Sequence, residues 1–222
     1  MSDLMVVAGA TGLVGSFAIS TALQRGWRVA ALVRDPGKVP QRDGLEAIAT
    51  NFDALADLSD RLKSAAPTAF LCALGTTIRT AGSQQAFARV DRDYVAAFAQ
   101  LGVAAGAKKF GMVSSIGADA ASSNFYLRTK GEAEAAVRAA GYAHVEIARP
   151  SFLTGPRAEK RIGEKIAVPV STALAPLLIG PLAVYRPIAA ATVARALVAG
   201  LEQSDDGVFV RHFPELRALA NA

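Results

Sequence analysis

A tyrosine, a lysine and a pair of serines are the residues of this chain whose types and spacing best suit acid–base chemistry. The segment SSIGADAASSNFYLRTK contains Ser114, Ser115, Tyr126 and Lys130. The pattern around Tyr126 is helical, and residues four apart on a helix project from one face. A free phenol has a pKa of about 10, whereas an ammonium group beside it favours the phenolate. The segment therefore predicts that Tyr126 donates or accepts a proton and that Lys130 adjusts its pKa.

The two serines are expected at the end of a strand, where a hydroxyl can bind an oxygen of the substrate. Such a donor stabilises the charge that develops on that oxygen during proton transfer. A tyrosine and a lysine at this spacing also occur by chance, so the pair alone is a weak signal. Its weight comes from order, because a glycine-rich turn, the serines, the tyrosine and the lysine follow one another as the mechanism requires.

Three glycines near the start of the chain indicate a dinucleotide site, the alternative being a tight turn that binds nothing. Gly9, Gly12 and Gly15 in AGATGLVG follow an apolar run and open a helical pattern. In such turns the first glycine makes the bend, the second lets a pyrophosphate approach and the third lets helix pack on strand. The helix start adds free N–H groups and a positive dipole end. The residues expected to contact the cofactor here are Gly9, Thr11, Gly12, Leu13, Val14 and Gly15.

The end of the second predicted strand, ALVRDPGK, bears on the choice between NADP(H) and NAD(H). An acidic residue at this point would hold the ribose hydroxyls of NAD, but Arg34 comes first and Asp35 second. A guanidinium can form a fork with the 2′-phosphate of NADP. We therefore expect NADP(H), with NAD(H) second and Lys38 as added support. The alternative is that Arg34 and Asp35 are ordinary solvated loop charges.

Short apolar runs alternate with longer helical patterns along the chain. This order predicts an α/β fold, a doubly wound parallel sheet of the Rossmann type whose strands are joined by crossover helices. The expected strands span residues 4–9, 27–34, 45–50, 68–74, 108–115 and 144–150, with an edge strand at 207–213. The expected helices span residues 13–25, 54–65, 83–105, 122–140 and 188–202.

Further cofactor contacts are expected where the strands end, because ligands of such sheets bind at the carboxyl ends of the strands. Asn51 and Phe52 follow the third strand and are placed near the adenine. Pro150 follows the sixth strand, where backbone groups are placed to meet the nicotinamide. The residues expected near the ribose, after the fourth strand, are Ala73, Leu74 and Gly75.

The regular alternation stops after Pro150, so residues 151–187 are expected to cover the substrate as a small C-terminal region of a single domain, residues 1–222. The uncharged stretch 166–185 is long enough to span a bilayer. Its three prolines each remove a helical hydrogen bond, which argues against a spanning helix. We interpret it as loop and short helices around a small apolar substrate, with contact at a membrane surface as the lesser alternative.

Composition excludes several classes of protein. With one cysteine and two histidines, neither a disulfide framework nor a metal site is expected. The net charge is +5, but the basic residues are scattered apart from short groups at 108–109 and 157–165, so nucleic acid is not expected as a partner. The glycine turn begins within nine residues of the start and leaves no room for a secretory signal, so we expect a cytoplasmic protein.

The segments LGTTIRTAGSQQAFARVDRDYV and KKFGMVSSIGADAASSNFYLRTKGEAE resemble the HIV Tat-interacting-protein family, a group of oxidoreductase-like atypical short-chain dehydrogenase/reductases. The likeness runs from the glycine turn to IARPSFLTGPR and fades after Arg157. It implies a Rossmann domain that binds NADPH and a catalytic set of Ser115, Tyr126 and Lys130. Lys130 would also hold the nicotinamide ribose, and Ser114 would lie closer to the cofactor.

One position departs from the wider superfamily that this family resembles. The fourth helix there often contributes an asparagine to a proton relay that reaches the lysine, whereas RVDRDYV places Asp91 near that position. An ionised Asp91 could form an ion pair with Lys130 and shift its pKa. The alternative is a surface carboxylate that pairs with Arg92 or with a later basic residue.

These observations favour an NADP-dependent oxidoreductase that transfers hydride between the nicotinamide and a carbonyl or alcohol carbon of a small-molecule substrate. The alternative is a regulatory protein that senses NADPH without turnover, since a fold by itself does not determine function. A homodimer through the fourth and fifth helices is expected only by analogy with related folds.

Overall fold

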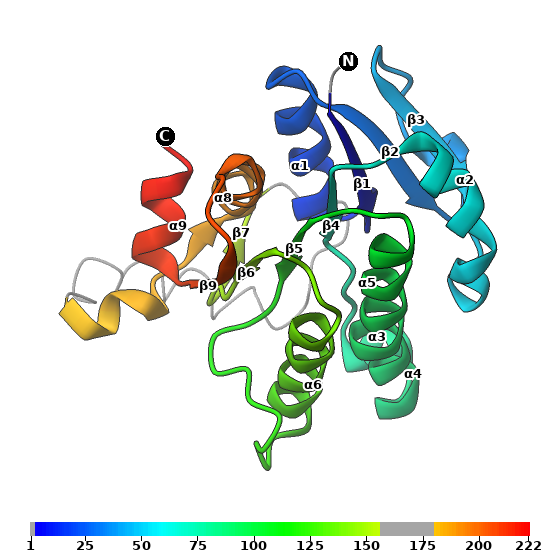
Figure 1. Cartoon of the computed structure of the whole chain (residues 1–222). Coiled ribbons are helices and arrows are strands. Elements are labelled where there is room, and N and C mark those ends of the chain that lie inside the picture. Colours follow the sequence, from blue (N-terminus) through cyan, green and yellow to red (C-terminus); the bar gives the residue numbers. More distant parts are fainter. Residues whose placement is uncertain (1–2, 156–179) are drawn as a thin grey trace.

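The computed structural model describes residues 3–155 and 180–222, and in this part of the chain one parallel sheet forms the centre (Figure 1). Its strands lie in the order β3-β2-β1-β4-β5-β6-β9, and every neighbouring pair is parallel. The strands are β1 (Leu4–Ala8), β2 (Arg28–Val33), β3 (Leu45–Ala49), β4 (Ala69–Cys72), β5 (Lys109–Val113), β6 (His144–Ala148) and β9 (Gly207–Arg211). The doubly wound α/β fold predicted from the alternation is confirmed, and so is the edge strand near the C-terminus.

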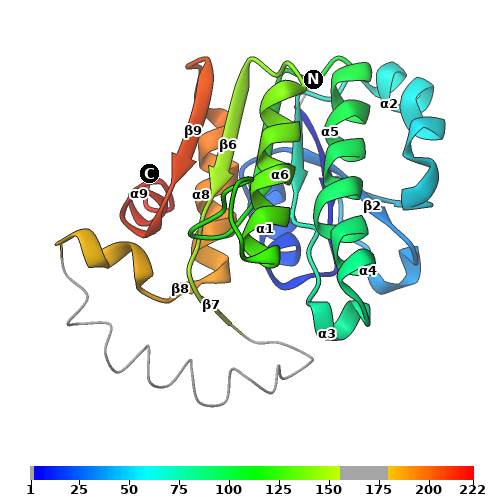
Figure 2. The same ribbon diagram turned by 90° about the horizontal axis from the view of Figure 1, so that it is seen from below.

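Helices cover both faces of the sheet, and the central strands β1 and β4 accordingly consist of apolar residues alone. Every residue of β1, β4 and β6 is buried. On one face lie α1 (Leu13–Gln24), α8 (Ala190–Glu202) and α9 (Phe213–Leu219). On the other lie α2 (Ser59–Ala65), α5 (Tyr94–Ala104) and α6 (Phe125–Ala139). Figure 2 shows α5 and α6 in front of the sheet, with α1 and α8 behind it.

The helix expected over residues 83–105 is not a regular α-helix. It consists of α4 (Gln84–Ala88), a π-helical turn η3 (Arg89–Asp93) and α5, and it follows a short helix α3 (Ile78–Ala81) that was not expected. A π turn contains one residue more than an α turn, which changes the direction of the side chains it carries. In η3 the side chain turned into the protein is that of Asp91.

Several predicted boundaries shift by a few residues. The helix expected at 54–65 is a 3₁₀ segment η2 (Phe52–Leu58) followed by α2, and a 3₁₀ turn η1 (Pro36–Lys38) follows β2. Helix α6 begins at Phe125 because the side chain of Asn124 accepts a hydrogen bond from the Leu127 amide and caps it. Helix α8 begins at Ala190, after a short strand.

Part of the region expected to cover the substrate, 156–179, lies outside the described residues. At its two ends, β7 (Leu153–Thr154) pairs in parallel with β8 (Ile188–Ala189), and a 3₁₀ segment η5 spans Gly180–Tyr185. In residues 3–155 and 180–222, no helix combines the length and the apolar character needed to cross a bilayer. Most of the stretch 166–185, on which the membrane alternative depends, is not described.

Candidate active site

The glycine turn after β1 is shaped by contacts that leave no space for side chains. Gly9 has φ of +82°, and a Cβ atom there would lie 2.4 Å from the carbonyl carbon of Ala73. A Cβ atom on Gly15 would lie 2.1 Å from the Gly9 oxygen. Gly9 thus brings the turn against the loop after β4, and Gly15 brings α1 against the turn.

The start of α1 has the features of an anion site. Gly12 is its N-cap, no side chain caps the helix, and its first turn has no acidic residue. The Gly12 amide donates to the Gly9 carbonyl at 2.9 Å, which closes the turn. Because uncapped amides and the helix dipole both favour negative charge, a diphosphate fits here. Thr11, Leu13 and Val14 lie in the same turn and first helical residues.

Arg34 and Asp35, which follow β2, have different surroundings. The Asp35 carboxylate accepts a hydrogen bond from the Gly37 amide at 3.1 Å and caps η1, with Lys38 at 3.9 Å. Arg34 is exposed, and the described residues give it no hydrogen bond or ion pair. The acidic side chain is therefore used by its own turn, and the guanidinium is available to a ligand.

The loop after β3 is held in place from α5. Asn51 caps η2 by accepting from the Asp53 amide at 3.0 Å, and the ring of Phe52 lies 5.7 Å from that of Tyr94. Asp53 accepts from the Tyr94 hydroxyl at 2.6 Å and from Arg89 at 2.7 Å. Asn51 and Phe52 follow the end of β3 at the same edge of the sheet as the glycine turn, where the predicted adenine contact would be made. The contact itself stays a prediction.

Lys130 of α6 forms a buried ion pair with Asp91 of η3. The Lys130 Nζ atom lies 2.7 Å from Asp91 Oδ1, and the Thr76 amide donates to Asp91 Oδ2 at 2.8 Å. Both side chains are buried. A Cβ atom on Gly75 would lie 3.5 Å from Asp91 Oδ1 and 3.9 Å from Lys130 Nζ, so the loop after β4 runs against the pair. Asp91 therefore forms the ion pair with Lys130 and is not a surface carboxylate paired with Arg92.

The charges around Lys130 decide its protonation. Burial acts to lower the pKa of Lys130, but the negative charge of Asp91 and the Tyr126 phenol oppose it, and the pKa is raised overall. Cys72, at the end of β4, is also buried, and this raises the pKa of its thiol to about 12. Cys72 is thus a neutral neighbour and Lys130 is an ammonium ion at physiological pH.

Tyr126 lies one turn before Lys130 on α6 and is 37% exposed. Its ring packs against Phe87 of α4, with 5.7 Å between ring centroids, and Phe87 also contacts Phe125 at 5.9 Å. Phe87 is completely buried. The aromatic packing fixes the body of Tyr126, while its partial exposure gives a substrate access to it.

The two serines at the end of β5 have different partners. The Ser114 hydroxyl donates to Glu134 of α6 at 2.5 Å, and Arg149 donates to the same carboxylate at 2.9 and 2.7 Å. Ser115 is half-buried and donates only to the Ile116 carbonyl, at 3.3 Å. A long bond to a neighbouring residue is readily exchanged for a better acceptor. Ser115 is therefore the serine whose hydroxyl is available to a substrate oxygen.

Helix α6 is held in place by two residues, Glu134 and Gly131, that were not predicted from the sequence. Glu134 anchors the helix to the ends of β5 and β6, and a Cβ atom on Gly131 would lie 2.1 Å from the Ala120 amide nitrogen. A signal for Glu134 exists, because Tyr126, Lys130 and Glu134 recur every four residues and so share one helical face. Gly131 had no such signal, since its role depends on how closely a distant loop approaches.

The loop after β6 is tied to neighbouring chain segments. The buried Pro150 accepts a hydrogen bond from the Ile116 amide at 3.0 Å, and the Ser151 hydroxyl donates to the Arg186 carbonyl at 2.6 Å. Phe152, which follows Ser151, is 48% exposed. The contact of Pro150 with a nicotinamide stays a prediction.

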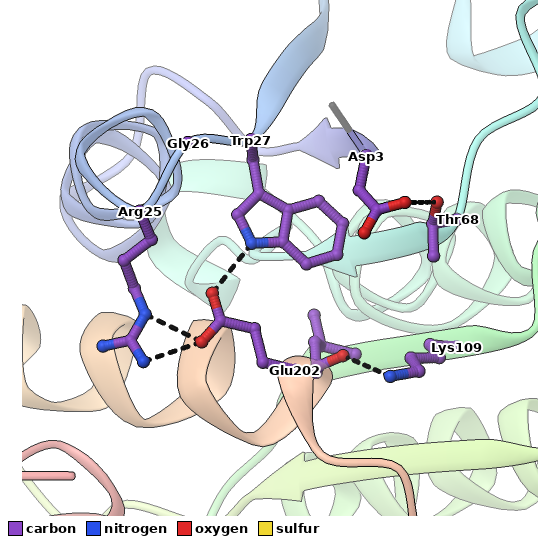
Figure 3. A pocket seen from close by; sticks show the side chains of 8 residues that line it. Asp3, Arg25, Gly26, Trp27, Thr68, Lys109 and Glu202 are labelled. Atoms are coloured by element: carbon purple, nitrogen blue, oxygen red, sulfur yellow. Dashed lines mark hydrogen bonds and ion pairs between the residues drawn. The ribbon is translucent and has the colours of Figure 1, made fainter. Parts of the chain in front are cut away.

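A separate cavity of about 220 Å³ lies at the opposite edge of the sheet, where β1, β4 and β5 begin (Figure 3). Its charged groups are already paired. Glu202 accepts from Arg25 at 2.8 Å and from the Trp27 indole at 2.9 Å, and Lys109 donates to the Leu201 carbonyl at 2.8 Å. These bonds fasten the C-terminal end of α8 to the sheet, and the cavity lies away from the glycine turn. No cluster of metal-ligating residues occurs among the described positions.

Comparison with known families decides the class of this protein. A sequence profile described as NAD(P)H-binding matches residues 9–204. The chain belongs to this NAD(P)H-binding family. The glycine turn lies at the start of the matched region.

Individual proteins with similar sequences support the family assignment. Protein HTATIP2 of Rattus norvegicus is 48% identical over 96 residues, which cover 43% of this chain and 39% of that protein. Protein fmp52, mitochondrial, of Emericella nidulans is 40% identical over 101 residues, or 46% of this chain and 43% of that protein. The chain thus spans about two fifths of these two relatives. Protein FMP52, mitochondrial, of Coccidioides immitis is 33% identical over 169 residues, which cover 71% of this chain and 69% of that protein. The resemblance to the Tat-interacting-protein family of atypical short-chain dehydrogenase/reductases is confirmed.

Solved structures share the fold at low sequence identity. The enzyme WbmG of Bordetella bronchiseptica, determined in complex with NAD, superposes with a TM-score of 0.71 at 15% identity, over 96% of this chain and 73% of that one. The UDP-Glc/GlcNAc 4-epimerase of Campylobacter jejuni superposes with a TM-score of 0.71 at 12% identity, over 98% of this chain and 82% of that one. At such identities the likeness establishes the fold alone.

The expected cytoplasmic location is contradicted by the relatives. The fungal proteins that match, including those of Emericella nidulans, Coccidioides immitis and Candida albicans, are named as mitochondrial. The prediction of a cytoplasmic protein is therefore wrong. Compartment depends on address signals read by receptors, and composition and a glycine turn carry no such signal.

Proposed function

We propose that this protein is an NADP(H)-dependent oxidoreductase that interconverts a carbonyl and an alcohol in a small substrate. The observation that carries the proposal is the placement of Tyr126 and Lys130 on one face of α6, with Lys130 held as an ammonium ion by Asp91 at 2.7 Å. A protein that only bound the dinucleotide would need the phosphate and ribose contacts alone. A buried cation next to a partly exposed phenol is an arrangement for moving a proton.

Each residue has a defined task in this chemistry. When bound, the nicotinamide gives a hydride to the substrate carbon or takes one from it. Tyr126 donates the proton that the substrate oxygen gains on reduction, or accepts it on oxidation. Ser115 donates a hydrogen bond to the same oxygen, and the Lys130 ammonium stabilises the phenolate that remains on Tyr126.

The preference for NADP(H) over NAD(H) is part of the proposal. The exposed Arg34 guanidinium, which has no partner among the described residues, supports it, because a free guanidinium can pair with a 2′-phosphate. The Asp35 carboxylate, which would repel that phosphate and would suit the ribose hydroxyls of NAD, is bound to the Gly37 amide.

The proposed substrate is a small apolar aldehyde, ketone or quinone, or the matching alcohol. This part rests on the sequence of residues 166–185, which is uncharged. A pocket lined by apolar side chains favours such compounds through the hydrophobic effect, while one hydroxyl and one phenol orient the reacting oxygen.

Turnover of NADPH tests the proposal. Purified protein is incubated with NADPH and a panel of apolar aldehydes, ketones and quinones, and NADPH loss is followed by absorbance beside Tyr126→Phe and Ser115→Ala. We expect wild-type turnover of at least one compound and a loss of roughly a hundredfold or more for Tyr126→Phe. Equal turnover by wild type and Tyr126→Phe would remove Tyr126 from the mechanism. Tight NADPH binding without turnover of any compound would favour a sensor of NADPH instead.

A further inference from the structure

We propose that Asp91 is a positioning residue whose negative charge, and not merely its hydrogen bonds, keeps Lys130 charged and in place for dinucleotide binding. The inference deepens the proposed function and rests on it, since Lys130 there stabilises the phenolate on Tyr126, and the family resemblance also gives Lys130 the contact with the nicotinamide ribose. An asparagine side chain has the same shape as that of Asp91 but carries no charge, so it could not keep Lys130 protonated.

The π turn η3 directs one carboxylate inward and leaves its other charges at the surface. Asp91 is 1% exposed, whereas Arg89 of the same turn is exposed, Arg92 is partly exposed, and both arginines have other partners. Arg89 pairs with Asp53 at 2.7 Å, and Arg92 pairs with Asp93 at 2.7 Å and Glu132 at 2.9 Å. Asp91 is therefore not neutralised by its own helix, and its counter-ion comes from α6.

Both oxygens of Asp91 are engaged, which fixes the direction of the carboxylate. Oδ2 accepts from the Thr76 amide at 2.8 Å, and Oδ1 lies 2.7 Å from Lys130 Nζ. The bond from Thr76 ties the carboxylate to the loop that follows β4, next to Gly75. A movement of Asp91 would therefore require movement of the backbone, and Lys130 is held at a defined point between η3 and the sheet.

The other titratable groups around Lys130 do not offset its charge. Tyr126 of α6 and Cys72 of β4 act on it in addition to Asp91. Cys72 carries no charge near neutral pH because burial raises the pKa of its thiol to about 12. Within the described residues, Asp91 is the anion that faces the buried ammonium. Without that charge, burial favours the neutral amine, because desolvation penalises the charged form.

The substitution Asp91→Asn separates charge from shape. The amide keeps an oxygen that accepts from Thr76 but cannot offset a buried cation. The dissociation constant of NADPH is measured by nucleotide fluorescence between pH 6.5 and 9.5. We expect a nearly constant value in the wild type and, for Asp91→Asn, a loss of affinity of roughly tenfold across this range as Lys130 loses its proton.

Matched variants assign the effect to Lys130. In Asp91→Asn/Lys130→Arg the cation no longer titrates, so we expect the pH dependence to disappear. Asp53→Asn alters an aspartate that pairs with Arg89 and Tyr94, and we expect it to leave the pH profile unchanged. If Asp91→Asn follows the wild type at every pH, or if the Arg variant keeps the dependence, the charge of Asp91 is not what holds Lys130.

A second measurement requires no nucleotide and so remains decisive if the proposed function fails. Thermal midpoints of wild type, Asp91→Asn and Asp91→Asn/Lys130→Met are compared between pH 7 and pH 10. A buried lysine with a lowered pKa destabilises the fold by a constant amount below that pKa, and the penalty then shrinks as pH rises toward the unfolded value of about 10.4. We therefore expect the deficit of Asp91→Asn to narrow as pH rises and the Lys130→Met double variant to be more stable than Asp91→Asn at pH 7. A constant deficit, or no recovery in the double variant, would overturn the proposal.

Discussion

Arg149 at the end of β6 forms a two-pronged contact with the buried carboxylate of Glu134 on α6, with N–O distances of 2.9 and 2.7 Å. The Ser114 hydroxyl at the end of β5 shares this carboxylate. Three segments that are far apart in the chain therefore meet one turn beyond Lys130. The contact fixes α6, and with it Tyr126, relative to the strand that carries Ser115.

Removal of the Arg149 guanidinium should destabilise the protein. The substitution Arg149→Met leaves the Glu134 carboxylate buried with only Ser114 and the more distant Arg138, at 3.7 Å, as partners. We expect the free energy of unfolding to fall by about 3 kcal/mol, as for other buried ion pairs that lose one member. Urea unfolding followed by the fluorescence of Trp27, the single tryptophan, measures it. Glu134→Gln added to Arg149→Met should recover part of the loss, and no recovery would show that the charge is unimportant.

Gly131→Ala should disturb the active site through the backbone. The added Cβ atom would lie 2.1 Å from the Ala120 amide and so would push the loop after Ser115 away from α6. Overpacking of this kind costs roughly 1 to 3 kcal/mol. We expect a lower midpoint in urea and a loss of turnover together. Gly37→Ala, at an exposed glycine whose nearest new contact is a flexible aspartate side chain, is the control and should change little.

Two glycines of the first turn should respond differently to alanine. At Gly9 the φ of +82° and the contact with Ala73 disfavour any side chain, so Gly9→Ala should destabilise the fold itself. Gly12 has φ of −79°, and its Cβ atom would lie 3.1 Å from the Gly9 oxygen, so Gly12→Ala should fold. It should nevertheless weaken NADPH binding by roughly tenfold or more, because the methyl group stands where a phosphate approaches. Unchanged NADPH affinity in Gly12→Ala would place the diphosphate elsewhere.

Arg34→Ala should reduce NADPH binding and leave NADH binding almost unchanged. A charge-assisted bond to a phosphate is worth about 1.5 to 3 kcal/mol, which corresponds to roughly a tenfold or larger loss of affinity. Titration calorimetry with both nucleotides provides the ratio. Arg42→Ala, which removes an exposed arginine bonded to Ser20, serves as the control. Equal losses for NADPH and NADH would contradict a contact with the 2′-phosphate.

A buried histidine should make stability depend on pH. Burial acts to lower the pKa of His144, but Glu146 and the Asp205 carbonyl outweigh it and raise the pKa. A raised pKa adds stability that is fully present below the unfolded value of about 6.5 and is lost as pH rises through the folded value. The deficit in unfolding free energy of His144→Gln should therefore be larger at pH 5.5 than at pH 8.5. Urea titrations at both pH values test this, and a deficit that grows with pH would contradict it.

The sequence determined the features that depend on neighbours in the chain. Glycine spacing, the alternation of apolar runs with helical patterns, and the interval between Tyr126 and Lys130 are local signals, and they predicted the turn, the parallel sheet and the shared helical face. The resemblance to the Tat-interacting-protein family came from the same residues. The compartment was predicted wrongly because no local pattern used here encodes it.

Only the tertiary structure decided which partners the buried polar groups have. A regular helix over 83–105 allowed Asp91 to pair with Arg92, but the π turn sends Arg92 to the surface and brings Asp91 to Lys130, 39 residues further along the chain. Ser114 likewise meets Glu134 and Arg149 because β5, β6 and α6 converge. Buried charges must find counter-ions wherever packing places them, and packing joins segments that sequence spacing does not relate.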